Sequence, residues 1–182
     1  MKNSIVVAIG IAQQLHKAYS SLGETVQGDS FNFIPSAAGM IERIYKIIDL
    51  EKIQKSDSII DLGCGVSPLL ISLFLENYTS LTGVDTEQRY LNVLNSIGGN
   101  YLGVKAFTTI RAELDKVPLT IKKAKLIYLY QPIQNREVYI KAVKRVWRQM
   151  NKGSIILDLC GPISQCIPEK FKNHNLGYYK KS

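Results

Sequence analysis

Short apolar runs alternate along this chain with longer stretches in which apolar residues recur every three or four positions. Apolar runs of that length, bounded by turn residues, are typical of buried strands, and the longer period is typical of amphipathic helices. The predicted strands cover residues 58–62, 80–84, 104–110, 125–130 and 154–159. The predicted helices cover residues 3–22, 36–50, 68–77, 87–97 and 136–151. Strands that alternate with helices predict an α/β fold: a doubly wound, mostly parallel sheet with helices on both faces.

The clearest amphipathic helix is the one predicted over residues 136–151. Its apolar face is formed by Tyr139, Val143, Val146, Trp147 and Met150. Another face carries basic residues at helical spacing, namely Lys141, Lys144, Arg145 and Arg148. We expect the helix to pack its apolar face on the sheet and to end at Lys152-Gly153.

The two ends of the chain differ from its regular middle. Residues 23–35 contain two glycines and a proline and are predicted to form a loop. Only residues 160–182 follow the fifth strand, so we expect a shortened ending with one or two strands around 176–180. The 182 residues fit one domain overall, with a helix and lid loop over 1–35 and the main domain over 36–182.

Two of the predicted strands end in an acidic residue. The first reads Ile59-Ile60-Asp61-Leu62 and opens into Gly63-Cys64-Gly65, a turn in which glycine permits positive φ and close approach of a ligand to the backbone. The second reads Leu81-Thr82-Gly83-Val84-Asp85. An acid there is suited to hold the two hydroxyls of a ribose, although it could instead cap the next helix.

This set of strand, acid, glycines, second strand and second acid resembles the cofactor region of class I S-adenosylmethionine (SAM) dependent methyltransferases. Ser67 replaces the third glycine of that family's turn and Pro68 follows it. We expect Ser67 to cap the next helix and Pro68 to occupy its first position. The likeness extends more weakly over residues 30–160.

The resemblance implies SAM as the cofactor and assigns roles to the strand ends. Asp61, Gly63, Cys64 and Gly65 would lie at the amino acid part of SAM, with Cys64 as a small residue that fits the turn. Asp85 would hold the ribose hydroxyls, and Thr86 would lie near the adenine.

The main rival is a nicotinamide dinucleotide domain, whose fingerprint is Gly-x-Gly-x-x-Gly. Counted from Gly63, its third glycine would fall on Pro68, which lacks the shape for close packing of helix on strand. The sequence therefore favours SAM.

The ends of the third and fourth strands supply the remaining candidates. The family usually places an acid near the adenine after the third strand; Glu113 fits best, while Asp115 or Arg111 could fall at that place. Tyr130-Gln131-Pro132 is similar to the substrate element of amino-directed methyltransferases, with Ile133 in place of its second proline. The same residues could equally form a turn into the next helix.

A faint likeness concerns residues 31–36, Phe-Asn-Phe-Ile-Pro-Ser. The family of the ATP-synthase c-subunit lysine methyltransferase carries a comparable aromatic and proline element at this place. The segment would fold over the cofactor as a lid, and the likeness hints at a protein lysine as acceptor.

Charge is unevenly distributed along the chain. Residues 1–104 hold 7 basic and 10 acidic side chains, whereas residues 105–182 hold 16 basic and 5 acidic ones. A basic half of this kind can attract nucleic acid, an anionic membrane face or an acidic protein, and it can also be a solvated surface. Apolar residues 5–11 are too few for a membrane span, which needs about 20.

Cysteine and histidine usage points away from metal chemistry. Cys64, Cys160 and Cys166 lack metal-ligand spacing, and the chain has only His16 and His174. We expect reduced thiols, a cytoplasmic protein and no metal site.

These features predict a SAM-dependent methyltransferase directed to a nitrogen of a macromolecule, protein or RNA. No obvious histidine or cysteine base accompanies the site, which favours catalysis by positioning of the acceptor. A small-molecule methyltransferase and a non-catalytic SAM-binding interaction module remain the alternatives.

Overall fold

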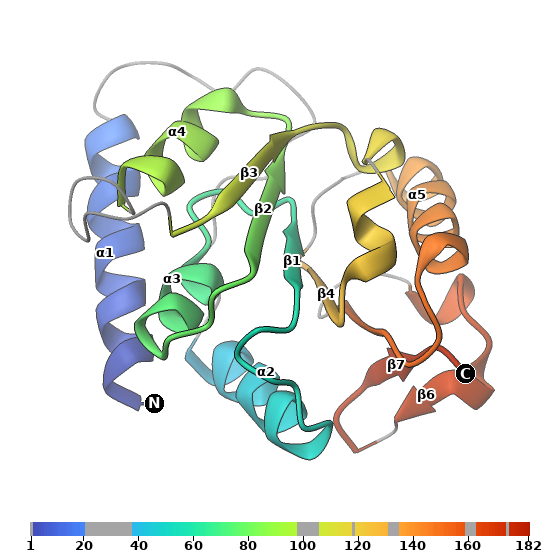
Figure 1. The fold of residues 1–182 in the computed structure, drawn as a ribbon. Helices are drawn as coiled ribbons and strands as arrows, with labels where there is room; N and C mark the ends of the chain where they lie inside the picture. Colours follow the sequence, from blue (N-terminus) through green and yellow to red (C-terminus); the bar gives the residue numbers. More distant parts are fainter. Residues whose placement is uncertain are drawn as a thin grey trace.

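The computed structural model describes residues 2–20, 38–97, 106–117, 119–130, 135–158, 163–173 and 175–182. A seven-stranded sheet forms its centre, in the order β3-β2-β1-β4-β5-β7-β6 (Figure 1). The strands are β1 Ile59–Leu62, β2 Leu81–Asp85, β3 Thr108–Arg111, β4 Leu126–Leu129, β5 Ile155–Asp158, β6 Lys172–Asn173 and β7 Tyr178–Lys180. The first five are parallel, and β7 pairs antiparallel with both β5 and β6. The predicted doubly wound sheet and its short final strands are confirmed.

Helices cover both faces of this sheet. The α-helices are α1 Lys2–Ser20, α2 Ala38–Leu50, α3 Pro68–Leu75, α4 Gln88–Ser96 and α5 Arg136–Gln149. Short 3-10 helices follow as η2 Leu114–Lys116, η3 Leu119–Lys123, η4 Ile163–Gln165 and η5 Glu169–Phe171. Side chains of α1 to α4 share one core with alternate strand residues, and α5 shares the second core with η2, η3 and η4.

The strands are apolar on both sides because each face is covered. In β1, Ile59 belongs to the first core while Ile60 and Leu62 belong to the second. All four residues of β1, β4 and β5 are buried, as expected for the middle of a parallel sheet.

The outer layer on the first face is α1. Helix α3 is buried from Pro68 through Leu73, because α1 packs on the side that the sheet leaves open. Ile5, Ala8 and Ala12, spaced three and four apart, are the buried residues of α1. The apolar N-terminal stretch is therefore a helix that packs on the domain.

Some predicted boundaries were wrong by a few residues. The third strand begins at Thr108 after buried Ala106 and Phe107, later than the predicted start at 104, which itself lies outside the described residues. Helix α3 stops at Leu75, because Asn77 adopts a left-handed φ of 66°. Helix α5 stops at Gln149, because the backbone of Met150 is extended, and Lys181 Nζ then donates to the carbonyls of Trp147, Arg148 and Met150.

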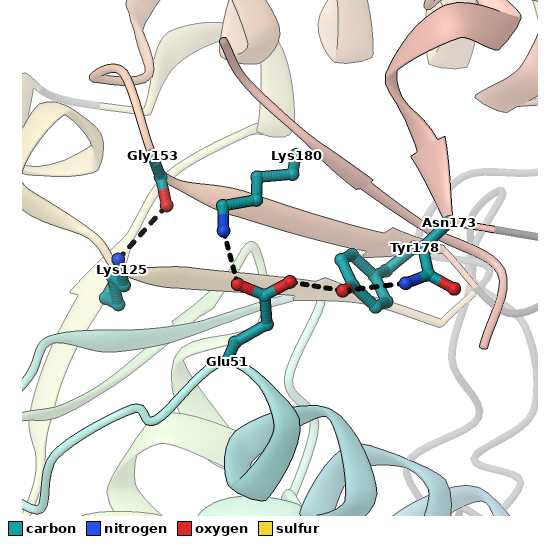
Figure 2. Close-up of polar contacts among 6 residues, drawn as sticks. All are labelled: Glu51, Lys125, Gly153, Asn173, Tyr178 and Lys180. Atoms are coloured by element: carbon teal, nitrogen blue, oxygen red, sulfur yellow. Dashed lines mark hydrogen bonds and ion pairs between the residues drawn. The ribbon is translucent and has the colours of Figure 1, made fainter. Parts of the chain in front are cut away.

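A polar network joins the C-terminal hairpin to the end of α2. Figure 2 shows Glu51 between Lys180 and Tyr178. Lys180 Nζ donates to the Glu51 carboxylate at 2.5 Å, and the Tyr178 hydroxyl donates to the same carboxylate. The Tyr178 hydroxyl also accepts a hydrogen bond from the Asn173 side chain. Burial acts to raise the pKa of Glu51, but the bonds from Lys180 and Tyr178 prevail and lower it. The hairpin is thus tied to a helix 129 residues earlier in the chain.

Candidate functional site

The order of strands reverses between β1 and β4, so the candidate site lies at the carboxyl ends of these two strands. The register places Leu62 of β1 directly beside Leu129 of β4 and beside Val84 of β2. The glycine turn after β1, Asp85 at the end of β2 and Tyr130 after β4 therefore meet at one edge of the sheet.

The turn after β1 is shaped by three residues with positive φ. Gly63, Gly65 and Ser67 have φ values of 77°, 50° and 38°. The backbone N–H groups of Gly63 and Cys64 both donate to the carbonyl of Val84, at 2.8 and 3.0 Å. This arrangement fastens the turn to β2 and leaves Gly63 exposed, with no side chain between its backbone and a ligand.

Ser67 takes the place of the third glycine by forming two hydrogen bonds. Its hydroxyl donates to Asp61 Oδ2 at 2.6 Å and accepts from the backbone N–H of Leu70 at 3.0 Å. It therefore caps α3, and Pro68 opens the helix, as predicted. A left-handed serine is uncommon and strained, so these two bonds help to hold it.

The side chain of Asp61 is buried beneath the glycine turn. Only 3% of its surface is exposed. The pKa of Asp61 is raised to about 7: burial is the main cause, the Ser67 hydroxyl opposes the shift, and the negative charge of Asp85 adds to it. We expected Asp61 to lie at the amino acid part of the cofactor. In the structure its carboxylate accepts the hydrogen bond from Ser67 within the turn.

Cys64 is a packing residue of the same turn. Burial raises the pKa of its thiol well above the ordinary value, and the nearby Asp61 and Asp85 act in the same direction. The thiol therefore stays neutral. Gly83 of β2 makes room for it, since a Cβ there would lie 2.9 Å from Cys64 Sγ and 2.8 Å from Leu94 Cδ2.

Asp85 bridges the turn and the next helix. Its Oδ2 accepts from the N–H of Gly65 at 2.8 Å, and its Oδ1 accepts from the N–H of Glu87 at 2.9 Å. Burial raises the pKa of Asp85, and these two backbone hydrogen bonds oppose the shift. Because a carboxylate has about four acceptor positions, both oxygens retain capacity for further donors. The N-cap of α4 is Glu87, so Asp85 is not the cap.

Residues at and just after the end of β3 contact Asp85 and Thr86 at the same edge of the sheet. The N–H of Ala112 donates to the carbonyl of Asp85 at 3.1 Å, and Arg111 Nε donates to the carbonyl of exposed Thr86 at 3.1 Å. Exposed Glu113 forms an ion pair with Lys116 at 2.9 Å. Its role near an adenine stays a prediction.

The segment predicted to be the substrate element begins with Tyr130, beside the glycine turn. Tyr130 follows β4, is half-buried and packs against the first core. Gln131 and Pro132 lie outside the described residues, as does the proposed lid over 31–36.

Sequence reasoning missed a third acid at this edge, and it is buried. Asp158 ends β5, is paired in register with Leu129 and is 7% exposed. Its charge affects Cys166 and Tyr179, which places it on the α5 side of the sheet. The signal was present, because Ile155-Ile156-Leu157-Asp158 repeats the pattern of an apolar run ending in an acid.

Two further features of the described residues bear on the expected chemistry. In the described part of the chain, no group of three or more His, Cys, Asp or Glu residues is placed so that it could hold a metal ion. The helices of the same part are all too short or too polar to cross a bilayer.

Comparison with known proteins places the fold. No protein-family model matches the chain, and no curated protein matches its sequence. Solved structures with a similar fold include an RNA methyltransferase from Salinibacter ruber in complex with S-adenosyl-L-homocysteine. It has a TM-score of 0.60 and 15% identity, over 81% of this chain and 92% of that one.

Two other similar structures are also methyltransferases. One is a SAM-dependent methyltransferase from Clostridium acetobutylicum, with a TM-score of 0.56 and 17% identity over 74% of this chain and 54% of that one. The other is coclaurine N-methyltransferase bound to N-methylheliamine and S-adenosyl-L-homocysteine, with a TM-score of 0.53 and 14% identity over 72% of this chain and 40% of that one. The chain thus spans about half the length of these two proteins. It has the Rossmann-like α/β fold of class I SAM-dependent methyltransferases.

Proposed function

We propose that the protein is a SAM-dependent methyltransferase that acts on a nitrogen of a macromolecule, protein or RNA. The observation that carries this proposal is the junction of the glycine turn with Asp85. Gly63 and Gly65 bring bare backbone to the strand edge, and the Gly65 N–H holds the carboxylate that ends β2. A turn and an acid so joined fit the amino acid and ribose parts of SAM.

The residues of the site divide into those that contact the cofactor and those that hold the site. Gly63, Gly65 and Asp85 are proposed contacts, with Thr86 and Glu113 toward the adenine. Asp61 and Ser67 act indirectly, since their mutual hydrogen bond fixes the turn. Cys64 fills the space beneath it.

When bound, SAM supplies an activated methyl group on a sulfonium, so the chain itself needs little acid-base machinery. Tyr130, with Gln131 and Pro132 after it, is proposed to orient the acceptor nitrogen in line with the methyl. Positioning of two reactants in this way supplies about 7–11 kcal/mol of the barrier.

The direct test is transfer of a radiolabelled methyl group from SAM into separated RNA, protein and small-molecule fractions of a cell extract. Label in RNA or protein supports the proposal. Label in small molecules only would give the alternative suggested by the fold shared with coclaurine N-methyltransferase. No label in any fraction, together with tight SAM binding, would leave the non-catalytic SAM-binding module.

Gly63→Arg tests the site assignment. The side chain of arginine would occupy the exposed surface of the turn, and φ of 77° is unfavourable for it. We expect a folded Gly63→Arg variant to lose SAM binding. Gly39→Arg is a matched control, because Gly39 lies on the exposed side of α2 with nothing within 4 Å of its Cβ position.

A further inference from the structure

The outer surface of α5 carries the densest positive charge at a helical spacing in the described chain. Lys141, Lys144, Arg145 and Arg148 are all exposed, and we call them the α5 basic face. At 100° per residue they fall within an arc of about 100° and extend over about 10 Å of helix. The buried residues Tyr139, Ala142, Val143 and Val146 occupy the other side of the helix.

The charges of the α5 basic face are available for a partner. Among the residues that the structure describes, Glu51, Glu87, Glu113 and Glu169 form ion pairs with other basic residues, and none of these pairs includes a member of the face. Glu137 is the only acidic residue of α5, and it lies in the first turn of the helix. Glu137 lies four residues before Lys141 on the same side of the helix, so the four basic residues share their face with one carboxylate and keep a large positive excess.

The basic surface continues into the C-terminal hairpin. Trp147 of α5 contacts Phe171 with ring centroids 5.5 Å apart, and Lys181 donates to the last carbonyls of the helix. A pocket of about 390 Å³ lies beside these contacts. It is lined by Glu51, Lys170, Phe171, Lys172, Asn173, Tyr178, Lys180, Lys181 and Ser182.

Two of the pocket lysines are already engaged within the protein. Glu51 holds Lys180, as Figure 2 shows, and Lys181 binds the carbonyls of α5. Lys170 and Lys172 lie on the side of η5 and β6, where Lys170 stands over the ring of Phe171 at 5.1 Å and Lys172 forms an exposed ion pair with Glu169. They extend the α5 basic face toward the hairpin.

This surface leads to the candidate site. Six residues separate the end of β4 from the start of α5, whose N-cap is Asn135, so the first turn of α5 is nearest to the carboxyl edge of the sheet. A chain lying along the α5 basic face would have one end near Tyr130.

The composition of the α5 basic face favours a phosphate backbone over an acidic protein surface as its binding partner. Protein interfaces usually have an apolar centre, whereas Val138 is the only large apolar residue of α5 that is exposed. Phosphate contacts require only lysine, arginine and similar donors. We propose that the α5 basic face, extended by Lys170 and Lys172, binds the phosphate backbone of a nucleic-acid substrate. In naming the methyl acceptor, this inference rests on the proposed function.

The test measures binding of the full chain to a fluorescein-labelled single-stranded RNA, by anisotropy over a series of salt concentrations. A DNA of the same sequence distinguishes the two sources of phosphate backbone. The variant is Lys141→Glu/Arg145→Glu. The control is Lys46→Glu/Lys52→Glu, which reverses two exposed charges at α2, on the opposite face of the sheet.

Each phosphate contact with a single strand contributes about 0.7 to the slope of log K against log salt. We therefore expect the α5 variant to reduce that slope by about 1.4, while the control leaves it unchanged. Equal weakening by both variants would show that only net charge matters and would overturn the inference. Tighter binding to polyglutamate than to RNA would overturn it in favour of an acidic protein partner.

Failure of this inference and failure of the proposed function give different results. SAM binding and methyl transfer without α5-dependent RNA binding would refute the inference alone. RNA binding that depends on the α5 basic face, without any SAM binding, would support the RNA-binding surface and refute the proposed methyltransferase function. Lys144→Gln/Arg148→Gln gives a second, milder variant, and circular dichroism confirms that each variant is folded.

Discussion

Asp61→Asn should make the protein more stable at neutral and alkaline pH and change how its stability depends on pH. Burial raises the pKa of the Asp61 carboxyl from its ordinary 3.8 to about 7. Between those two values the native state holds a proton that the unfolded chain has lost, so stability falls as pH rises through this window. Above it, the full cost of an ionised buried carboxylate is present.

The size of the effect follows from the same two values. One pKa unit corresponds to about 1.4 kcal/mol, so keeping Asp61 ionised costs about 4 kcal/mol of unfolding free energy above neutral pH. Asparagine removes this cost and keeps an oxygen to accept the hydrogen bond from Ser67. The stability of Asp61→Asn relative to the natural protein should therefore rise by about 4 kcal/mol from about pH 4 to about pH 8.

Urea denaturation at a series of pH values measures this difference directly. Asp49→Asn, at an exposed position of α2, controls for the loss of one negative charge. A difference between Asp61→Asn and the natural protein that stays constant with pH would refute the reasoning. So would a variant that loses most stability at alkaline pH.

Three further substitutions test the packing and the hydrogen bonds around the site. Gly83→Ala should lower the free energy of unfolding by about 1–3 kcal/mol, because its Cβ would overlap Leu94 and Cys64; Gly39→Ala, with free space, should not lower it, and equal losses would contradict the packing argument. Ser67→Ala should cost about 1 kcal/mol through loss of the α3 cap and should weaken SAM binding, whereas unchanged SAM affinity would separate Ser67 from the cofactor site. Glu51→Gln should cost about 1 kcal/mol and speed amide hydrogen exchange in β7, because the pair with Lys180 is partly exposed; unchanged exchange would mean that the hairpin is held by other contacts.

Much of the fold was predictable because its signals are local. Apolar runs located the five parallel strands, and helical spacing located most of the buried residues of α5. The cap at Ser67 and Pro68 also depends on neighbours within one turn. Local patterns of this kind are readable from one sequence.

What could not be predicted depends on residues far apart in the chain. The need for glycine at position 83 arises from Cys64 and Leu94, which approach it from two other elements. The position of Asp61 beneath the turn follows from the hydrogen bond with Ser67, which only the folded turn reveals. The tie from Glu51 to Lys180 joins the ends of the domain. Tertiary packing decides these features, and propensity does not.

The central claim is that the glycine turn and Asp85 form a SAM site. Calorimetric titration of the protein with SAM and, separately, with NAD tests it most directly, with Gly63→Arg as the site variant and Gly39→Arg as its control. We expect micromolar SAM binding, no NAD binding, loss of SAM binding in Gly63→Arg and unchanged SAM binding in Gly39→Arg. Absence of SAM binding by the folded natural protein, or unchanged SAM affinity in folded Gly63→Arg, would contradict it.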